Sequence, residues 1–227
     1  MFDKRWRSEF EKQLKPVGVT IRRTGVTADH LTALGVVMAG AASVAIANGA
    51  LRAGVLLLTL TALPDVLDGA VAKASGTASP HGAFFDSVMD RVSDALLLGG
   101  VAWYLSSTEP GRIAILPVAV MAGSLLVSYE RAKAEALGFD AKGGLMERAE
   151  RLLALGFGLL FDSLLIGVLW VMLAATVFTV GQRFVKVWRQ ASKPVPDPMP
   201  EPRQRRVRRT ARPSERLLAR RDRKPRP

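Results

Sequence analysis

Long apolar segments alternate with short polar ones over most of this chain. The first four segments are each long enough to cross a bilayer, which takes roughly 20 residues. The apolar segments lie at residues 32–50, 51–71, 83–107, 112–136, 150–161 and 164–188. Asp162 and Ser163 separate the last two, which favours two short helices joined by a turn over one span beside a buried helix. We therefore expect an all-α integral membrane protein with six transmembrane helices, formed by residues 25–190.

The two ends of the chain differ from this apolar middle. Within residues 1–24, apolar side chains recur every four positions among basic ones, at Phe2, Trp6, Phe10 and Leu14. This spacing predicts an amphipathic juxtamembrane helix on the membrane surface, although a soluble helix packed on a neighbour would show it too. Residues 191–227 are rich in proline and arginine and poor in apolar residues, which is typical of a disordered tail.

The formal net charge of +12 is concentrated in that tail, because residues 194–227 hold 12 Lys or Arg and 4 Asp or Glu. The tail either attracts anionic lipid or only sets topology. Nucleic-acid binding is disfavoured, since no aromatic residues are interleaved with the arginines. The other basic residues gather on the side of both termini, whereas the opposite loops hold only Arg52 and Arg112. The positive-inside bias therefore predicts a multi-pass protein of the cell membrane with both termini in the cytosol.

Four aspartates lie where the second apolar segment ends and the third begins: Asp65, Asp68, Asp86 and Asp90. A charged aspartate in the bilayer costs roughly 2.5–3.5 kcal/mol, so four of them require cationic partners. The first two share one helix face by i,i+3 spacing and the last two by i,i+4 spacing. Their all-oxygen donor set favours Mg²⁺ or Mn²⁺ over Zn²⁺, and a pair of such ions typically clamps a phosphoryl group. Interhelical ion pairs and a cation pathway through a non-catalytic carrier are the alternatives.

The aspartates belong to a longer motif. The chain reads DVLDGAVAK from Asp65, then eight residues, then GAFFDSVMD, which ends at Asp90. This resembles the CDP-alcohol phosphotransferase signature D-x2-D-G-x2-A-R-x8-G-x3-D-x3-D. Every fixed position agrees except Lys73, which stands where the family has arginine. The resemblance extends over about residues 15–190.

The resemblance implies a homodimeric enzyme that binds a CDP-linked lipid, usually CDP-diacylglycerol, with its pyrophosphate on two Mg²⁺ ions. Asp65 and Asp86 would bridge the ions, Asp68 would hold one, and Asp90 would hold the other and act as the base. The hydroxyl of an acceptor alcohol would attack the lipid-side phosphorus, and CMP would leave. The implied nucleotide contacts are Asp29, Thr32, Gly69, Lys73 and Ser79.

Basic residues after the motif bear on the acceptor alcohol. Arg148 and Arg151 share a helix face, and Arg183 ends the last apolar segment. If they converge near the aspartates, they would form an anion pocket for an acceptor that already bears a phosphate; topogenic charge is the alternative reading. The stretches SYERAKAEA and ERAER also resemble bacterial phosphatidylinositol-phosphate synthases, whose acceptor is inositol 1-phosphate (1D-myo-inositol 3-phosphate). The implied phosphate contacts are Arg131, Lys133, Arg148, Arg151 and Arg183. Glycerol 3-phosphate, the acceptor of phosphatidylglycerophosphate synthase, is the competing alcohol.

Overall fold

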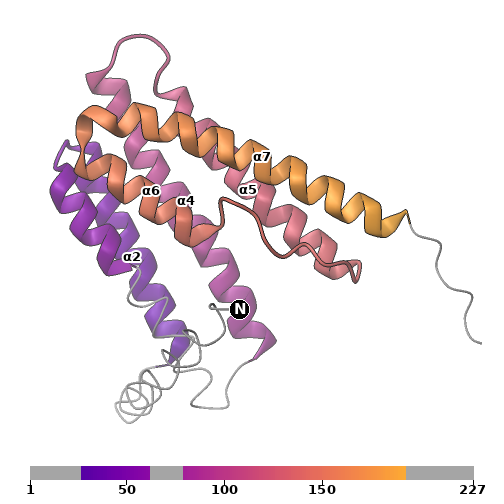
Figure 1. Cartoon of the computed structure of the whole chain (residues 1–227). Helices are drawn as coiled ribbons and strands as arrows, with labels where there is room; N and C mark the ends of the chain where they lie inside the picture. Colours follow the sequence, from indigo (N-terminus) through magenta and orange to yellow (C-terminus); the bar gives the residue numbers. More distant parts are fainter. Residues whose placement is uncertain (1–26, 62–78, 193–227) are drawn as a thin grey trace, which may run out of the picture. The chain divides into compact units, whose positions relative to one another are not determined.

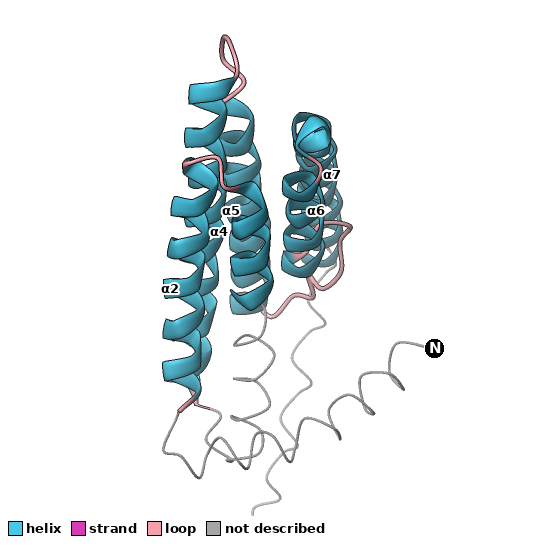
Figure 2. Ribbon diagram, turned by 90° about the vertical axis from the view of Figure 1, so that its left-hand side faces the viewer, coloured by secondary structure: helices cyan, strands magenta, loops and turns pink. Residues whose placement is uncertain are grey.

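The computed structural model describes residues 27–61 and 79–192, and over these residues the protein is all-α (Figures 1 and 2). Its elements are α2 (Ala28–Ala47), a short apolar helix (Leu51–Thr61), α4 (Pro80–Thr108), α5 (Ile115–Ala136), α6 (Arg148–Leu160), the 3₁₀ turn η1 (Asp162–Leu164) and α7 (Leu165–Ala191). The predicted helix over residues 1–24, the first half of the aspartate motif and the tail beyond Ser192 lie outside the described residues.

Three helical stretches are long and apolar enough to cross a membrane: Ala28–Ala47, Ile115–Ala136 and Asp162–Ala191. Helix α4 has 29 residues, but its first half contains Asp86, Asp90, Arg91 and Asp94, which lower its mean hydropathy. The expectation of an all-helical membrane protein is confirmed for the described residues, which form helices and include three candidate spans. The number of six spans stays a prediction.

Local sequence signals explain where several helices begin and end. Thr27 caps α2 in a reciprocal capping box with His30, and Ser79 caps α4 by accepting a hydrogen bond from the Gly82 amide at 3.1 Å. Pro80 follows Ser79 at the first helical position, where a missing amide hydrogen carries no cost. The predicted break at Asp162 is confirmed, because α6 ends just before it and η1 begins there.

Helices α2 and α4 pack side by side over much of their length (Figure 1). The Ser43 hydroxyl of α2 donates to the Leu96 carbonyl of α4 at 2.7 Å. A Cβ atom on Gly100 would lie 2.6 Å from the Ser43 carbonyl oxygen, so this contact requires glycine. Small residues at such positions let helix backbones approach closely in lipid, where packing replaces the hydrophobic driving force.

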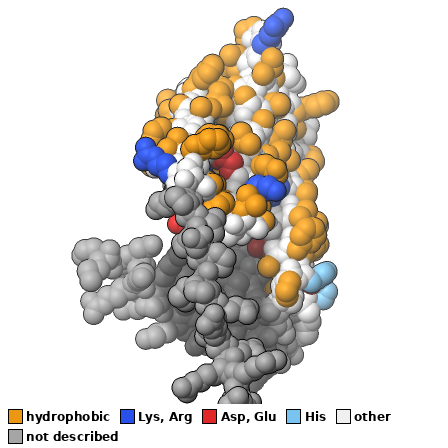
Figure 3. Space-filling model, turned by 90° about the vertical axis from the view of Figure 1, so that its right-hand side faces the viewer, with side chains coloured by type: hydrophobic (Ala, Val, Ile, Leu, Met, Phe, Trp, Pro, Cys, Tyr) orange, Lys and Arg blue, Asp and Glu red, His pale blue; other side chains and the backbone are white. Residues whose placement is uncertain are grey.

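The described surface is unusually apolar for a protein in water. Hydrophobic side chains cover much of the face shown in Figure 3. Among the large exposed ones are Val37, Trp103, Leu153, Val171 and Trp188, each at least 64% exposed. An apolar surface of this extent marks a contact with lipid or another apolar partner. Together with the three candidate spans, it indicates a membrane protein.

Candidate functional site

Three aspartates form a stripe along α4. Asp86, Asp90 and Asp94 recur at i, i+4 and i+8, so they lie on one face over two helical turns. Asp86 and Asp90 are partly buried, and Asp94 is only 7% exposed. A carboxylate that is buried this deeply requires a cationic partner.

Asp94 has two such partners, both from the first turn of α6. Arg151 Nη2 donates to Asp94 Oδ2 at 2.6 Å, and Arg148 Nη1 donates to Asp94 Oδ1 at 3.1 Å. The i,i+3 spacing of the two arginines brings both guanidinium groups to this one carboxylate. Arg151 is itself 6% exposed, so this is a buried ion pair between α4 and α6.

Arg148 also connects Asp94 to Asp90. Its Nη1 atom lies 3.3 Å from Asp90 Oδ1 and donates to the Asp90 backbone carbonyl at 2.6 Å. Arg91 adds a weaker ion pair, with its Nη1 atom 4.0 Å from Asp90 Oδ2. Asp90, which the family resemblance implies is the base, is therefore in direct contact with Arg148, which the same resemblance implies is an acceptor contact.

These groups border a cavity of about 300 Å³ between α4, α5, α6 and α7, here named the arginine cavity. Five arginines line it: Arg91, Arg131, Arg148, Arg151 and Arg183. The acidic residues that line it are Asp90, Asp94, Glu147 and Glu150. Guanidinium groups bind phosphate with two parallel hydrogen bonds, and five of them at one cavity favour a small anionic ligand.

Arg183 enters the arginine cavity from α7 and is held by three hydrogen bonds, to α5 and to the loop before α6. Its Nε donates to the Gly143 carbonyl at 3.0 Å, its Nη1 to the Val127 carbonyl at 2.9 Å, and its Nη2 to Glu147 Oε1 at 3.0 Å. The residue is only 3% exposed. These contacts fix the direction of the guanidinium group and fasten the loop before α6 to α5 and α7.

That loop depends on glycine and on a second set of contacts to α7. Gly143 and Gly144 have φ angles of +91° and +150°, which other residues rarely adopt. Lys186 Nζ donates to Asp140 Oδ2 at 2.9 Å, and Gln190 Nε2 donates to the Asp140 carbonyl at 2.7 Å. Because Lys186 donates to this carboxylate and the Lys142 amide does as well, the pKa of Asp140 lies below its ordinary value. The loop thus carries Glu147 and Arg148 into the site from an anchored position.

At the N-terminus of α4 the structure brings together two of the residues predicted to bind the nucleotide. An added Cβ on Gly82 would lie 3.4 Å from Ser79 Oγ and 3.6 Å from Asp29 Oδ1, so both side chains border the same glycine. His81 Nδ1 is 3.9 Å from Asp29 Oδ2. Thr32 is one turn further along α2, where its hydroxyl donates to the Ala28 carbonyl at 3.2 Å. Gly69 and Lys73, the other predicted contacts, lie outside the described residues.

The predicted metal ligands are only partly within the described chain. Asp86 and Asp90 share a face of α4, whereas Asp65 and Asp68 fall in the gap between residues 61 and 79. Within residues 27–61 and 79–192, no three His, Cys, Asp or Glu side chains are grouped to hold a metal ion. The two carboxylates present are partly buried, with oxygen donors of the kind that Mg²⁺ and Mn²⁺ prefer, and therefore suit half of such a site.

The predicted acceptor contacts separate into two groups. Arg131, Arg148, Arg151 and Arg183 line one cavity, whereas Lys133 is exposed on α5 and does not line it. Arg131 is directed partly elsewhere, because its Nε donates to Glu135 at 3.1 Å on the surface of α5. The four arginines therefore lie around one cavity, as expected, and Lys133 lies outside it.

Sequence reasoning missed Asp94 and Glu147. Asp94 continues the Asp86–Asp90 spacing by one more turn, and a carboxylate before the apolar run ALLLGG was an available signal. Glu147 precedes Arg148 directly, but its partner Arg183 is 36 residues away. No local spacing identifies a contact of that separation.

Comparisons with known proteins match most of the chain to one family. The sequence model of the family described as CDP-alcohol phosphatidyltransferase matches residues 25–188. A phosphatidylinositol phosphate synthase from Streptomyces avermitilis is 34% identical over 208 residues, which covers 85% of each chain. An archaetidylinositol phosphate synthase from Methanothermobacter thermautotrophicus is 36% identical over 176 residues, or 74% of this chain and 86% of that one.

Solved structures give the same result. The crystal structure of Mycobacterium tuberculosis phosphatidylinositol phosphate synthase with CDP-DAG bound superposes with a TM-score of 0.74 at 29% identity, over 81% of this chain and 98% of that one. The structure of the same enzyme in complex with manganese and citrate also has a TM-score of 0.74, at 30% identity, over 81% of this chain and 93% of that one.

Proposed function

The chain belongs to the CDP-alcohol phosphatidyltransferase family, and we propose that it is a phosphatidylinositol-phosphate synthase. It transfers a phosphatidyl group from CDP-diacylglycerol to inositol 1-phosphate and releases CMP. The observation that carries the choice of acceptor is the arginine cavity, where four predicted phosphate contacts line one space beside Asp90. A relative at 34% identity and a structural neighbour that binds CDP-DAG support both substrates.

In the proposed reaction, Asp65, Asp68, Asp86 and Asp90 hold two Mg²⁺ ions, with Mn²⁺ as an alternative. The crystal structure of a related synthase with manganese supports dependence on a divalent metal. When bound, such ions neutralise the charge of the pyrophosphate and stabilise the leaving CMP. The described half of this set, Asp86 and Asp90, occupies one face of α4.

The nucleotide end of the substrate lies at the N-termini of α2 and α4 in this proposal. Asp29 and Ser79, which border Gly82, contact the cytidine diphosphate together with Thr32, Gly69 and Lys73. The N-terminus of α4 also exposes amide hydrogens that favour a phosphate. Lys73 supplies charge to that phosphate without the planar fork of the arginine that the family has there.

The acceptor enters the arginine cavity with its phosphate toward Arg148, Arg151 and Arg183. Arg131 and the exposed Lys133 contribute charge from α5. Asp90 lies at the boundary of this cavity, 3.3 Å from Arg148, and takes the proton from the attacking hydroxyl. A phosphate that binds Arg148 competes for the guanidinium group with Asp90, which leaves this carboxylate freer to act as a base.

The membrane setting follows from the substrate, whose acyl chains remain in the bilayer while its headgroup is in water. We propose six spans over residues 25–190, an amphipathic juxtamembrane helix before them, and a disordered tail from residue 191. Both termini and the active site face the cytosol of a cell membrane, and the enzyme is a homodimer by family analogy. The charge asymmetry of the loops supports this orientation.

An acceptor assay tests the proposed activity. The full-length protein in vesicles would be given CDP-diacylglycerol, Mg²⁺ and either inositol 1-phosphate or glycerol 3-phosphate. We expect release of CMP with inositol 1-phosphate and at least tenfold less with glycerol 3-phosphate. The reverse preference would assign the chain to phosphatidylglycerophosphate synthesis, and no release with either alcohol would contradict the proposal.

A further inference from the structure

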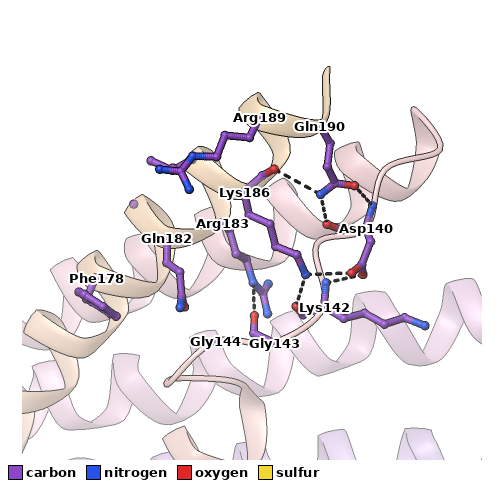
Figure 4. Close-up of a pocket in the computed structure, with 12 residues that line it drawn as sticks. Asp140, Lys142, Gly143, Gly144, Phe178, Gln182, Arg183, Lys186, Arg189 and Gln190 are labelled. Atoms are coloured by element: carbon purple, nitrogen blue, oxygen red, sulfur yellow. Dashed lines mark hydrogen bonds and ion pairs between the residues drawn. The ribbon is translucent and has the colours of Figure 1, made fainter. Parts of the chain in front are cut away.

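A second cavity, which the proposed reaction does not use, lies at the C-terminal end of α7 (Figure 4). We name it the α7 groove. Its volume is about 990 Å³, and its walls are α7 and the loop between α5 and α6. A volume of this size accommodates a ligand much larger than the phosphate that fits the arginine cavity.

The wall formed by α7 is apolar at one end and basic at the other. Phe178, Gln182, Val185 and Arg189 recur at i, i+4, i+7 and i+11 and so lie along one face of the helix. Phe178 is 57% exposed and Val185 is 45% exposed. Figure 4 shows Phe178, Gln182 and Arg189 in this order along α7. The groove is open beside Gly181, because an added Cβ there would have no atom within 4 Å.

The charge of the groove is strongly positive. Four cations line it, Lys142, Arg183, Lys186 and Arg189, against the single carboxylate of Asp140. Lys186 already neutralises Asp140, at 2.9 Å, and Arg183 is held by the loop. Within the described chain, no hydrogen bond or ion pair engages the side-chain nitrogens of Lys142 or Arg189. Both side chains are exposed and extend in different directions, Lys142 from the loop and Arg189 from α7 (Figure 4). They place positive charge on both walls of the groove.

The aromatic residues of α7 indicate the depth of this charge in a membrane. Phe184 and Trp188 stack with ring centroids 5.8 Å apart, and the tryptophan is 64% exposed. Exposed tryptophans of membrane-spanning helices gather at the level of the lipid headgroups. Because Arg189 is adjacent to Trp188 in sequence, it lies at that level too, whereas Phe178 lies about three turns deeper.

From these observations we infer that the α7 groove binds an acidic membrane phospholipid, with its headgroup at the basic end formed by Lys142, Lys186 and Arg189 and an acyl chain beside Val185 and Phe178. Charge complementarity selects an acidic headgroup over a zwitterionic one, since basic pockets between helices at this depth attract anionic lipid. The apolar wall selects a lipid over a free phosphate. The site is separate from the arginine cavity, although Arg183 lines both.

Quenching of Trp188 fluorescence tests this inference directly. The full chain would carry phenylalanine in place of Trp6, Trp103 and Trp170, which leaves Trp188 as the single tryptophan. It would be reconstituted with phosphatidylglycerol or phosphatidylcholine, each brominated near the headgroup. We expect stronger quenching by phosphatidylglycerol, with a relative binding constant at least fivefold higher, because one basic residue near the surface contributes about that factor. Equal quenching by both lipids would overturn the inference.

Two variants of the groove localise the effect. K142E/R189E should abolish the preference for phosphatidylglycerol, and G181L should reduce it by filling the groove. The matched controls are R52E/R112E, which reverses two charges that do not line the groove, and G167L, whose added side chain also meets open space on α7. Both controls should keep the preference. A preference that survives in K142E/R189E would contradict the site.

Free phosphate provides the last comparison. Inorganic phosphate at millimolar concentration should leave the preference for phosphatidylglycerol unchanged. If phosphate abolished the preference, the groove would be a site for a soluble anion and not for a lipid. Melting temperatures confirm that each variant is folded. If K142E/R189E does not fold, K142Q/R189Q and G181L decide the question by the same measurement.

Discussion

Arg151 Nη2 donates a hydrogen bond to Asp94 Oδ2 at 2.6 Å, and both residues are less than 9% exposed. The contact joins α4 to α6 across 57 positions of sequence. Because Asp94 also accepts from Arg148, one carboxylate orients two of the arginines that line the cavity. In the proposed reaction Asp94 is therefore a positioning residue, which acts on the acceptor through Arg148 and Arg151.

Replacing Asp94 with asparagine should impair acceptor binding more than turnover. The substitution keeps the size of the side chain and removes the charge, so the hydrogen bonds to the arginines lose about 1.5–3 kcal/mol. We expect the KM for inositol 1-phosphate to rise roughly 10- to 150-fold, and the KM for CDP-diacylglycerol to change little. Asp162→Asn is the matched control, because its carboxylate contacts Tyr104 and does not line the arginine cavity. Equal changes in both KM values for Asp94→Asn would indicate a general loss of structure.

Replacing Arg148 with alanine should raise the acceptor KM far more than that for CDP-diacylglycerol. A charge-assisted contact to the acceptor phosphate is lost, which corresponds to a change of at least tenfold. Lys133→Ala is the informative comparison, because Lys133 is a predicted contact that is exposed and does not line the cavity. We expect a smaller effect from it. Steady-state kinetics with each substrate varied in turn would show whether the acceptor KM rises more in Arg148→Ala than in Lys133→Ala.

Replacing Asp90 with asparagine should abolish turnover and leave nucleotide binding largely intact. General-base catalysis contributes about 10²- to 10⁴-fold to rate, and asparagine cannot accept the proton. The measurements are CMP release and equilibrium binding of CDP-diacylglycerol to the purified variant. Near-normal turnover would remove Asp90 from the role of base.

The contact between Asp140 and Lys186 should make stability depend on pH in the acidic range. Hydrogen bonding to Lys186 holds the pKa of Asp140 below its ordinary value. The stabilising contribution is therefore present above the unfolded pKa and is lost as the pH falls through the lower, folded value. The melting temperature of wild type should exceed that of Asp140→Asn at neutral pH, and the difference should disappear in strong acid. It should also be small, because the pair is exposed to solvent. A difference that stays constant across this range would contradict the assignment.

The helices were predictable because their signal is local. The apolar segments correspond to helices in the described chain, and the break at Asp162 was visible as two polar residues between apolar runs. Helix boundaries followed from caps such as Ser79 with Pro80. The number of spans could not be derived in the same way. Helix α4 combines an apolar half with a charged half, and the helix Leu51–Thr61 is by itself too short for a span.

The site was only partly predictable. The i,i+3 spacing of Arg148 and Arg151 indicated a shared face, and the structure brings both to the same carboxylate. The identity of that carboxylate could not be derived, because Asp94 contacts the two arginines across 54 and 57 positions. Lys133 was predicted from its place in a motif, but it does not line the arginine cavity. A motif position alone does not determine which way a side chain faces.

Discrimination between inositol 1-phosphate and unphosphorylated inositol tests most directly the claim that the arginine cavity binds the phosphate of the acceptor. Wild-type protein in vesicles, with CDP-diacylglycerol and Mg²⁺, would be given each alcohol in turn while CMP release is measured. A site that is built to bind a polar group rejects an analogue lacking it by about 10⁴- to 10⁵-fold in kcat/KM. The account predicts turnover with inositol 1-phosphate and a kcat/KM for free inositol lower by about that factor; comparable values for the two alcohols would contradict it.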